Sequence, residues 1–209
     1  MGSSMLQRFK SMVSELQSNP AIELTQSTFK PPATAGELDQ ARETFKLTPA
    51  MVDFYSECNG ITIKWERATG KEIPEGGLAA GSIDLRPVQE VFGDWEDEIY
   101  TDEDDQYAPL HPVDFFVPEA CAALYLDGSP DPEVYYHYLG EDMRRMGVNF
   151  EGYLELLLKS RGFWYWQRAV AKPPNTKRGL MISIEEQNFR KVMPELFPDF
   201  RDSDFKKLS

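Results

Sequence analysis

The sequence has few residues that bind metals or form disulfides, with two cysteines and two histidines among 209 residues. Cys58, His111, Cys121 and His137 stand far apart, without C-x-x-C or H-x-x-x-H spacing. A structural zinc site takes about four such ligands at close spacing, and a disulfide-stabilised fold takes more cysteines, so we expect no metal site and no disulfide scaffold. Two isolated thiols suit a reducing compartment, which favours the cytoplasm.

A long apolar run is also missing. No stretch approaches the roughly 18 to 20 apolar residues of a membrane-spanning helix, and the opening MGSSMLQRFK lacks the apolar segment of a secretory signal. We therefore expect no membrane association. Hydrophobic residues make up 41% of the chain and charged residues 27%, which is typical of a globular protein.

Positive charge is scarce. The chain carries 22 Lys and Arg against 35 Asp and Glu, a formal net charge of −13. Such a field repels nucleic-acid phosphates and attracts basic partners. The acidic residues are densest in DWEDEIYTDEDDQY (94–107), which has eight carboxylates between positions 94 and 105.

Known catalytic motifs are absent as well. The sequence has no G-x-S-x-G elbow, no P-loop spacing and no EF-hand pattern. Cys58 lies on the apolar face of a predicted helix, which favours a small buried hydrophobe over a nucleophile. We expect no enzyme activity, no catalytic residue and no cofactor.

Helix signals are clear at several places. Apolar residues recur at helical spacing between positions 6 and 16. Thr34 and Glu37 form the pattern of a capping box, and Thr48 followed by Pro49 begins a second capped helix. Asn149 is the expected cap of a late helix.

Strand signals occupy the middle of the chain. ITIKW (61–65) alternates apolar and polar residues, and SIDLRPV (82–88), VDFFV (113–117), CAALYLD (121–127) and EVYYHYL (133–139) also read as strands. The pattern predicts an α+β fold with a sheet of four to six strands. We expect an N-terminal helix and linker (1–33), an α+β domain (34–170) and a C-terminal helical extension (171–209).

The order of these segments resembles the SUKH superfamily, which unites fungal regulators of cell-wall assembly with bacterial immunity proteins that neutralise toxins. The residues that carry the resemblance are L-x-P-x-x-x-x-F-Y-x-x-x-N-G (47–60), a strand with Trp65, G-x-I-x-L-x-P (81–87) and F-x-x-Y-L (150–154). It covers about residues 34–168, and the acidic segment and the extension lie outside the common pattern. The resemblance implies an antiparallel sheet with helices packed mainly on one side, which works as a protein-binding module. It offers no catalytic residues.

Together these features predict an immunity protein that binds a cognate toxin through an acidic surface and acts in bacterial competition. The expected partner is a toxin with a basic active-site surface, while nucleic acids and membranes are not expected partners, and the oligomeric state stays open. The alternatives are a scaffold or regulatory module of the cell-wall assembly type, an enzyme that uses a divalent cation, and a merely solvated acidic loop. The predicted partner-binding residues are Asp94, Trp95, Glu96, Asp97, Glu98, Tyr100, Asp102, Glu103, Asp104 and Asp105. Trp95, Ile99, Tyr100 and Tyr107 are expected to supply the apolar contacts.

Overall fold

The computed structural model describes residues 3–68, 70, 79–102, 105–173 and 182–208. The helices are α1 (Met5–Ser18), α2 (Ala35–Thr44), α3 (Pro49–Glu57), α4 (Val88–Val91), α5 (Phe150–Ser160) and α6 (Ile184–Leu196), with short 3-10 turns η2 (Trp166–Ala169) and η3 (Asp202–Asp204). The strands are β1 (Ile22–Phe29), β2 (Ile61–Arg67), β3 (Ala80–Leu85), β4 (Leu110–Val117), β5 (Ala120–Tyr125), β6 (Val134–Tyr138) and β7 (Arg144–Arg145). None of the described helices combines the length and the apolar character needed to cross a membrane.

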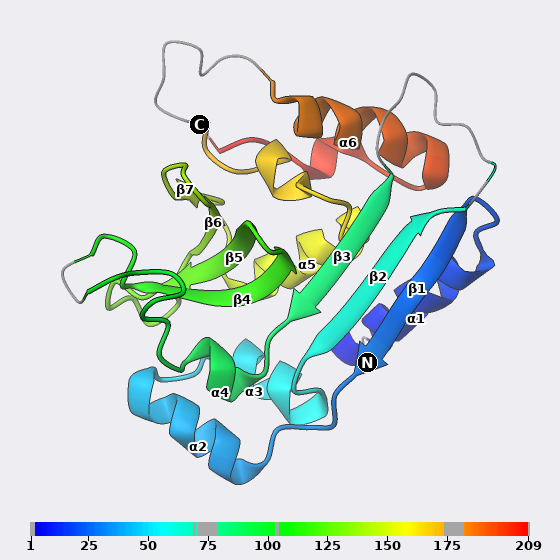
Figure 1. Ribbon diagram of the computed structural model, residues 1–209. Helices are drawn as coiled ribbons and strands as arrows, with labels where there is room; N and C mark the ends of the chain where they lie inside the picture. Colours follow the sequence, from blue (N-terminus) through cyan, green and yellow to red (C-terminus); the bar gives the residue numbers. More distant parts are fainter. Residues whose placement is uncertain (1–2, 69, 71–78, 103–104, 174–181, 209) are drawn as a thin grey trace.

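The strands form one antiparallel sheet in the order β1-β2-β3-β4-β5-β6-β7 (Figure 1). The predicted α+β class and antiparallel sheet are confirmed, but the predicted count of four to six strands is too low, since the described sheet has seven. The two unpredicted strands lie at the edges. β1 carries a register shift between Leu24 and Gln26 that breaks the alternation of side chains, and β7 has only two residues.

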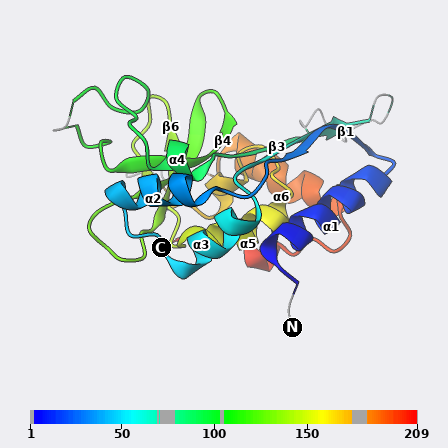
Figure 2. The same cartoon turned by 90° about the horizontal axis from the view of Figure 1, so that it is seen from below.

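The helices cover one face of the sheet. Figure 2 shows α1, α3, α5 and α6 on one side, while the chain between α4 and β4 stands on the other side. α2 and α4 pack against each other at one end of the strands (Figure 1). Among the described residues, this arrangement leaves the opposite face of the sheet, here called the outer face, free of helices.

Both ends of the chain belong to the main hydrophobic core. Residues 1–33, predicted as a helix and linker, contain strand β1, whose Ile22 is buried. The C-terminal extension folds back, and Phe189, Met193 and Phe205 are buried in the same cluster as Trp65 of β2. The described chain therefore folds around a core that crosses both predicted boundaries.

The predicted helix caps are present. Thr34 accepts the Glu37 amide at 3.3 Å while the Glu37 carboxylate accepts the Thr34 amide at 2.7 Å, which completes the capping box. Thr48 and Asn149 each accept one amide in the first turn of α3 and α5, respectively. These contacts satisfy amides that have no partner inside the helix, which explains why the helices begin at these residues.

The residues of the N-G and G-x-I motifs hold the sheet to its helices. Asn59 accepts the Val88 amide at the start of α4, at 2.8 Å. Trp65 donates its indole N–H to the Arg161 carbonyl at 2.7 Å and lies over Gly81. A β-carbon at Gly81 would lie 2.1 Å from the Trp65 indole nitrogen, so this strand position requires glycine.

Candidate functional site

The acidic loop, of which the structure describes residues 94–102 and 105–107, is attached to the outer face of the sheet by Trp95. Its side chain is only 5% exposed and stacks on Phe115 of β4 with ring centroids 5.8 Å apart. The indole N–H donates to the Val91 carbonyl at the end of α4, at 3.2 Å. Trp95 was predicted to contact a partner, and in the structure its side chain packs mainly within the protein.

A second, smaller hydrophobic cluster lies beneath the loop. Leu110, Cys121 and Ala123 are buried there, and the loop residues Ile99 and Tyr107 pack against them. The Tyr107 ring also lies against His137, with centroids 5.0 Å apart. The apolar residues of the loop therefore point toward β4, β5 and β6, and its surface is left to the charged residues.

Two of the carboxylates hold the loop in shape. Asp94 accepts the Glu96 amide at 3.0 Å and the Tyr100 hydroxyl at 2.8 Å. The Glu96 amide, and next the Tyr100 hydroxyl, keep the pKa of the Asp94 carboxyl below its usual value. Asp105 accepts the amides of Thr101 and Tyr107 at 3.3 and 3.0 Å. These contacts fix two successive turns.

Three other carboxylates face solvent and are called the outward carboxylates: Glu96, Asp97 and Glu98. No ion pair joins them to another residue in the described ranges. Asp102 is exposed as well, whereas Glu103 and Asp104 lie outside the described residues. Of the predicted partner-binding residues, the outward carboxylates are thus available to a partner, and Tyr100 is half-buried.

Beside the loop, strands β3 and β4 separate. One register pair, Leu85 with Asp114, joins them in the described sheet. The N-terminal part of β3 forms hydrogen bonds instead with the segment after α5. The Ser82 amide donates to the Gly162 carbonyl at 2.8 Å, and the Trp164 amide donates to the Ala80 carbonyl at 3.0 Å. We call this divergence the fork.

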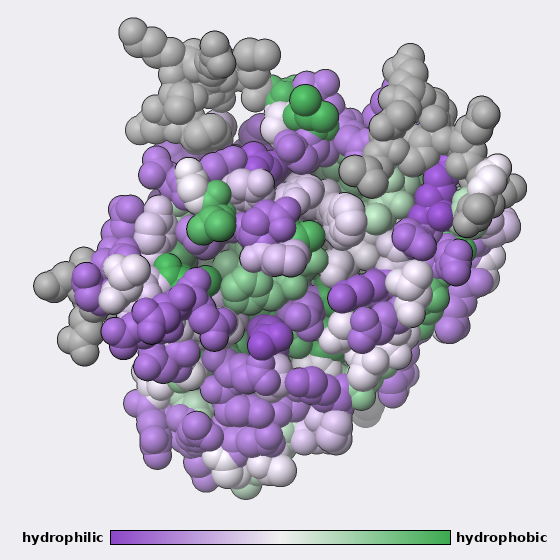
Figure 3. All heavy atoms as spheres, viewed as in Figure 1, coloured by the Kyte–Doolittle hydropathy of each residue, from purple (hydrophilic) through white to green (hydrophobic). Residues whose placement is uncertain are grey.

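A groove of about 340 Å³ opens at the fork. It is called the fork groove and is lined by Lys64, Ser82, Asp84, Arg86, Trp95, Glu98, Phe115, Phe116, Val117 and Pro118. Figure 3 shows apolar surface over β4, surrounded by hydrophilic residues. The groove therefore joins an apolar floor to the acidic loop through Glu98, an arrangement suited to a protein contact.

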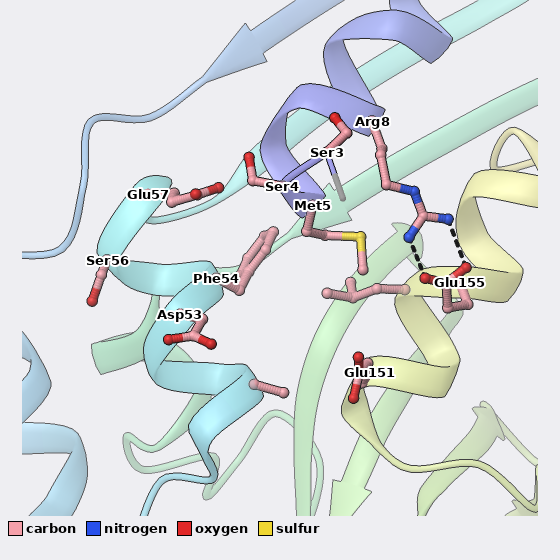
Figure 4. A pocket seen from close by; sticks show the side chains of 12 residues that line it. Ser3, Ser4, Met5, Arg8, Asp53, Phe54, Ser56, Glu57, Glu151 and Glu155 are labelled. Atoms are coloured by element: carbon pink, nitrogen blue, oxygen red, sulfur yellow. Dashed lines mark hydrogen bonds and ion pairs between the residues drawn. The ribbon is translucent and has the colours of Figure 1, made fainter. Parts of the chain in front are cut away.

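A second acidic surface lies among the helices. A cleft of about 490 Å³, called the helical-face cleft, opens between α1, α3 and α5. Figure 4 shows Asp53, Glu57 and Glu151 around it, with Arg8 paired to Glu155. The Arg8–Glu155 pair is bidentate, with one N–O distance of 2.6 Å, so the one arginine that lines this cleft already has a carboxylate partner.

The cysteine side chains are buried and the histidine side chains are partly buried. Cys58 and Cys121 are buried, and burial raises the pKa of each thiol. Burial lowers the pKa of His111, which is bonded to the Val91 carbonyl at 2.9 Å, and of His137. Across the described part of the chain, no three Cys, His, Asp or Glu residues are arranged to hold a metal ion. Burial disfavours the thiolate form that acts as a nucleophile.

Sequence reasoning did not find the fork groove or the helical-face cleft. Both are assembled from segments far apart in the chain, for example Lys64 with Phe115 in the groove and Arg8 with Glu155 in the cleft. One signal was available, since Asp114 interrupts an otherwise apolar strand in LHPVDFFV. A carboxylate on a buried strand requires an explanation, and here it bonds to the fork.

Comparisons of the chain with protein-family models, with curated proteins and with solved structures find no match.

Proposed function

We propose that the protein is a SUKH-type immunity protein, which neutralises a cognate bacterial toxin by direct, stoichiometric binding. The docking surface is the outer face, formed by the outward carboxylates and the fork groove. One observation about the acidic loop supports this proposal. Trp95 and Asp94 stabilise its conformation, while Glu96, Asp97 and Glu98 face solvent without ion pairs in the described ranges.

A fixed loop favours binding over mere solvation. A flexible acidic loop loses conformational entropy when a partner orders it, whereas a loop already held by turns and by aromatic stacking loses less. The Asp97 backbone lies in the left-handed region, at φ 65°, which costs free energy and is maintained by the surrounding contacts. Holding the carboxylates in this arrangement therefore costs part of the free energy of folding.

The chemistry of the surface indicates a basic partner. Unpaired carboxylates accelerate the encounter with a positively charged protein, and the apolar floor of the fork groove supplies area that is removed from water in the complex. A toxin that acts on an anionic substrate has such a basic surface at its active site. Blocking that surface neutralises the toxin without any reaction catalysed by this protein.

The helical-face cleft supports a second candidate, a scaffold or regulatory module of the cell-wall assembly type. The cleft and the acidic loop lie on opposite sides of the sheet, so two basic partners can bind at the same time (Figure 2). A scaffold is expected to bind several partners weakly, whereas an immunity protein binds one partner tightly. The two candidates therefore differ in stoichiometry and in affinity.

Where a toxin gene lies beside the gene for this chain, co-expression with the encoded toxin domain tests the proposal. We expect the wild-type chain to protect the host cell and to copurify with the toxin in a 1:1 complex. The loop variant Glu96→Gln/Asp97→Asn/Glu98→Gln removes three exposed charges and leaves Asp94 and Asp105 in place. The matched control, Asp53→Asn/Glu57→Gln/Glu151→Gln, removes the same charge from the helical-face cleft. Protection that fails in the control and survives in the loop variant would contradict the proposed surface.

A further inference from the structure

Asp114 is a buried carboxyl group at the point where the fork closes. Its side chain has no solvent exposure and lies within the register pair that joins β3 to β4. One carboxyl oxygen accepts the Asp84 amide at 2.7 Å, and the other accepts the Tyr153 hydroxyl at 2.6 Å. The group therefore links the sheet to helix α5.

The contact continues into the interior. The Tyr153 hydroxyl also accepts the side-chain amide N–H of Gln167 at 3.4 Å. Gln167 is fully buried, yet its carbonyl oxygen Oε1 has no hydrogen-bond partner among the described residues. A buried carbonyl oxygen without a donor is destabilising, so this unused acceptor needs an explanation.

We propose that Asp114, Tyr153 and Gln167 form a proton-operated hydrogen-bond relay, in which the Gln167 carbonyl oxygen is the acceptor held for the protonated state. When Asp114 takes up one proton from solvent, its new O–H donates to the Tyr153 oxygen. The Tyr153 O–H then turns away and donates to Gln167 Oε1, after the amide group rotates. Both hydrogen bonds reverse direction, and the rotation exchanges the places of the Gln167 amide oxygen and amide nitrogen, so that the oxygen faces Tyr153.

The surroundings of Asp114 allow both states. Facing it are Asp84 from β3, Tyr153 from α5 and the Cys121 thiol from β5, none of them a cation. The Asp84 carboxylate is itself bonded to Arg86 at 3.3 Å. Burial, which is the largest cause, raises the pKa of Asp114 to about 7 against the opposing effect of its two hydrogen-bond donors.

The relay makes the protein sensitive to pH near neutrality. The folded state holds the Asp114 proton more tightly than the unfolded state, whose carboxyl has the ordinary pKa of 3.8. The stability from the proton is complete below that ordinary value and is lost as pH rises toward about 7. Above that value, the ionised group adds a negative charge one residue from Phe115, which carries the acidic loop. The relay does not depend on the proposed partner.

Nuclear magnetic resonance of the full chain tests the relay, by following the Asp114 carboxyl carbon and the Gln167 side-chain amide from about pH 5 to about pH 9. We expect both signals to shift with one common midpoint near 7. In Asp114→Asn, whose side chain resembles the protonated acid, we expect the Gln167 shift to disappear, whereas the surface control Glu98→Gln retains it. The wild-type titration decides the question if Asp114→Asn does not fold.

Gln167→Met gives a second test, because it removes both the long N–H contact of the ionised state, at 3.4 Å, and the acceptor of the protonated state. We expect the Asp114 midpoint to fall to lower pH, because only the protonated state then leaves the Tyr153 O–H without an acceptor. An Asp114 carboxyl that keeps one state over the whole pH range would overturn the relay. So would a Gln167 amide that stays unchanged while Asp114 titrates, or a midpoint that Gln167→Met leaves in place.

Discussion

The acidic loop and the helical-face cleft have charge of the same sign but are built differently. In the loop, Asp94 and Asp105 are used for turns, and the outward carboxylates have no ion-pair partner among the described residues. In the cleft, Glu155 pairs with Arg8, Asp53, Glu57 and Glu151 are exposed, and the aromatic ring that lines it, Phe54, is buried in the core. Exposed carboxylates thus occur on both surfaces, and what distinguishes the loop is that its turns and Trp95 support them.

Removing the support of the loop has the largest expected effect. Trp95→Ala deletes a nearly buried indole and its stacking on Phe115, which we expect to lower the free energy of unfolding by about 3 kcal/mol. Much of the loss is local, so amides of the loop should exchange faster while those of α5 stay protected. Chemical denaturation and hydrogen exchange measure the two effects. Trp95→Phe, which keeps a ring over Phe115, is the control, and equal exchange in Trp95→Ala and wild type would show that the loop does not depend on this residue.

Removing charge has the next largest expected effect, on the rate of association. With three loop carboxylates neutralised, we expect the association rate with the toxin domain at low salt to fall about tenfold. The control with Asp53, Glu57 and Glu151 neutralised should lose much less, although its net charge is the same. Stopped-flow measurements at several salt concentrations separate long-range attraction from contact at the surface. Equal losses in both variants would mean that overall charge, and not the loop, guides the partner.

Breaking the ion pair in the cleft has the smallest expected effect. Arg8 and Glu155 have side chains 37% and 36% exposed, so Arg8→Met should cost only about 0.5 kcal/mol. The Arg8 hydrogen bond keeps the pKa of Glu155 below its usual value. The contribution of the ion pair to stability is therefore present above the ordinary pKa of Glu155, and it is lost as pH falls through the lowered pKa of this carboxyl. Thermal unfolding at neutral and at acidic pH measures this, and a loss of several kcal/mol would show that the cleft is more rigid than its exposure implies.

Much of the fold could be predicted from local patterns. The caps at Thr34, Thr48 and Asn149 depend on residues three or four positions apart, and the alternation in 61–65 is visible in the sequence itself. Strand β1 was not predicted, because the irregularity after Leu24 breaks its alternation of side chains and most of these side chains are exposed. An edge strand with one irregular position resembles a linker in sequence.

The acidic loop was predictable as a charged segment but not as a structure. Sequence gives no sign that Trp95 points inward, because its stacking partner Phe115 lies twenty positions later. The same limit applies to the relay, whose members Asp114, Tyr153 and Gln167 come from a strand, a helix and a 3-10 turn. Tertiary packing determined which polar residues became structural and which remained free to bind.

Hydrogen exchange of the chain, alone and with the toxin domain, tests the docking surface most directly. We expect the loop amides to be protected from exchange already in the free chain. In the complex, we expect added protection at the outward carboxylates and along β4. Added protection confined to α1, α3 and α5, or loop amides that exchange freely until the toxin is present, would contradict the proposed docking surface.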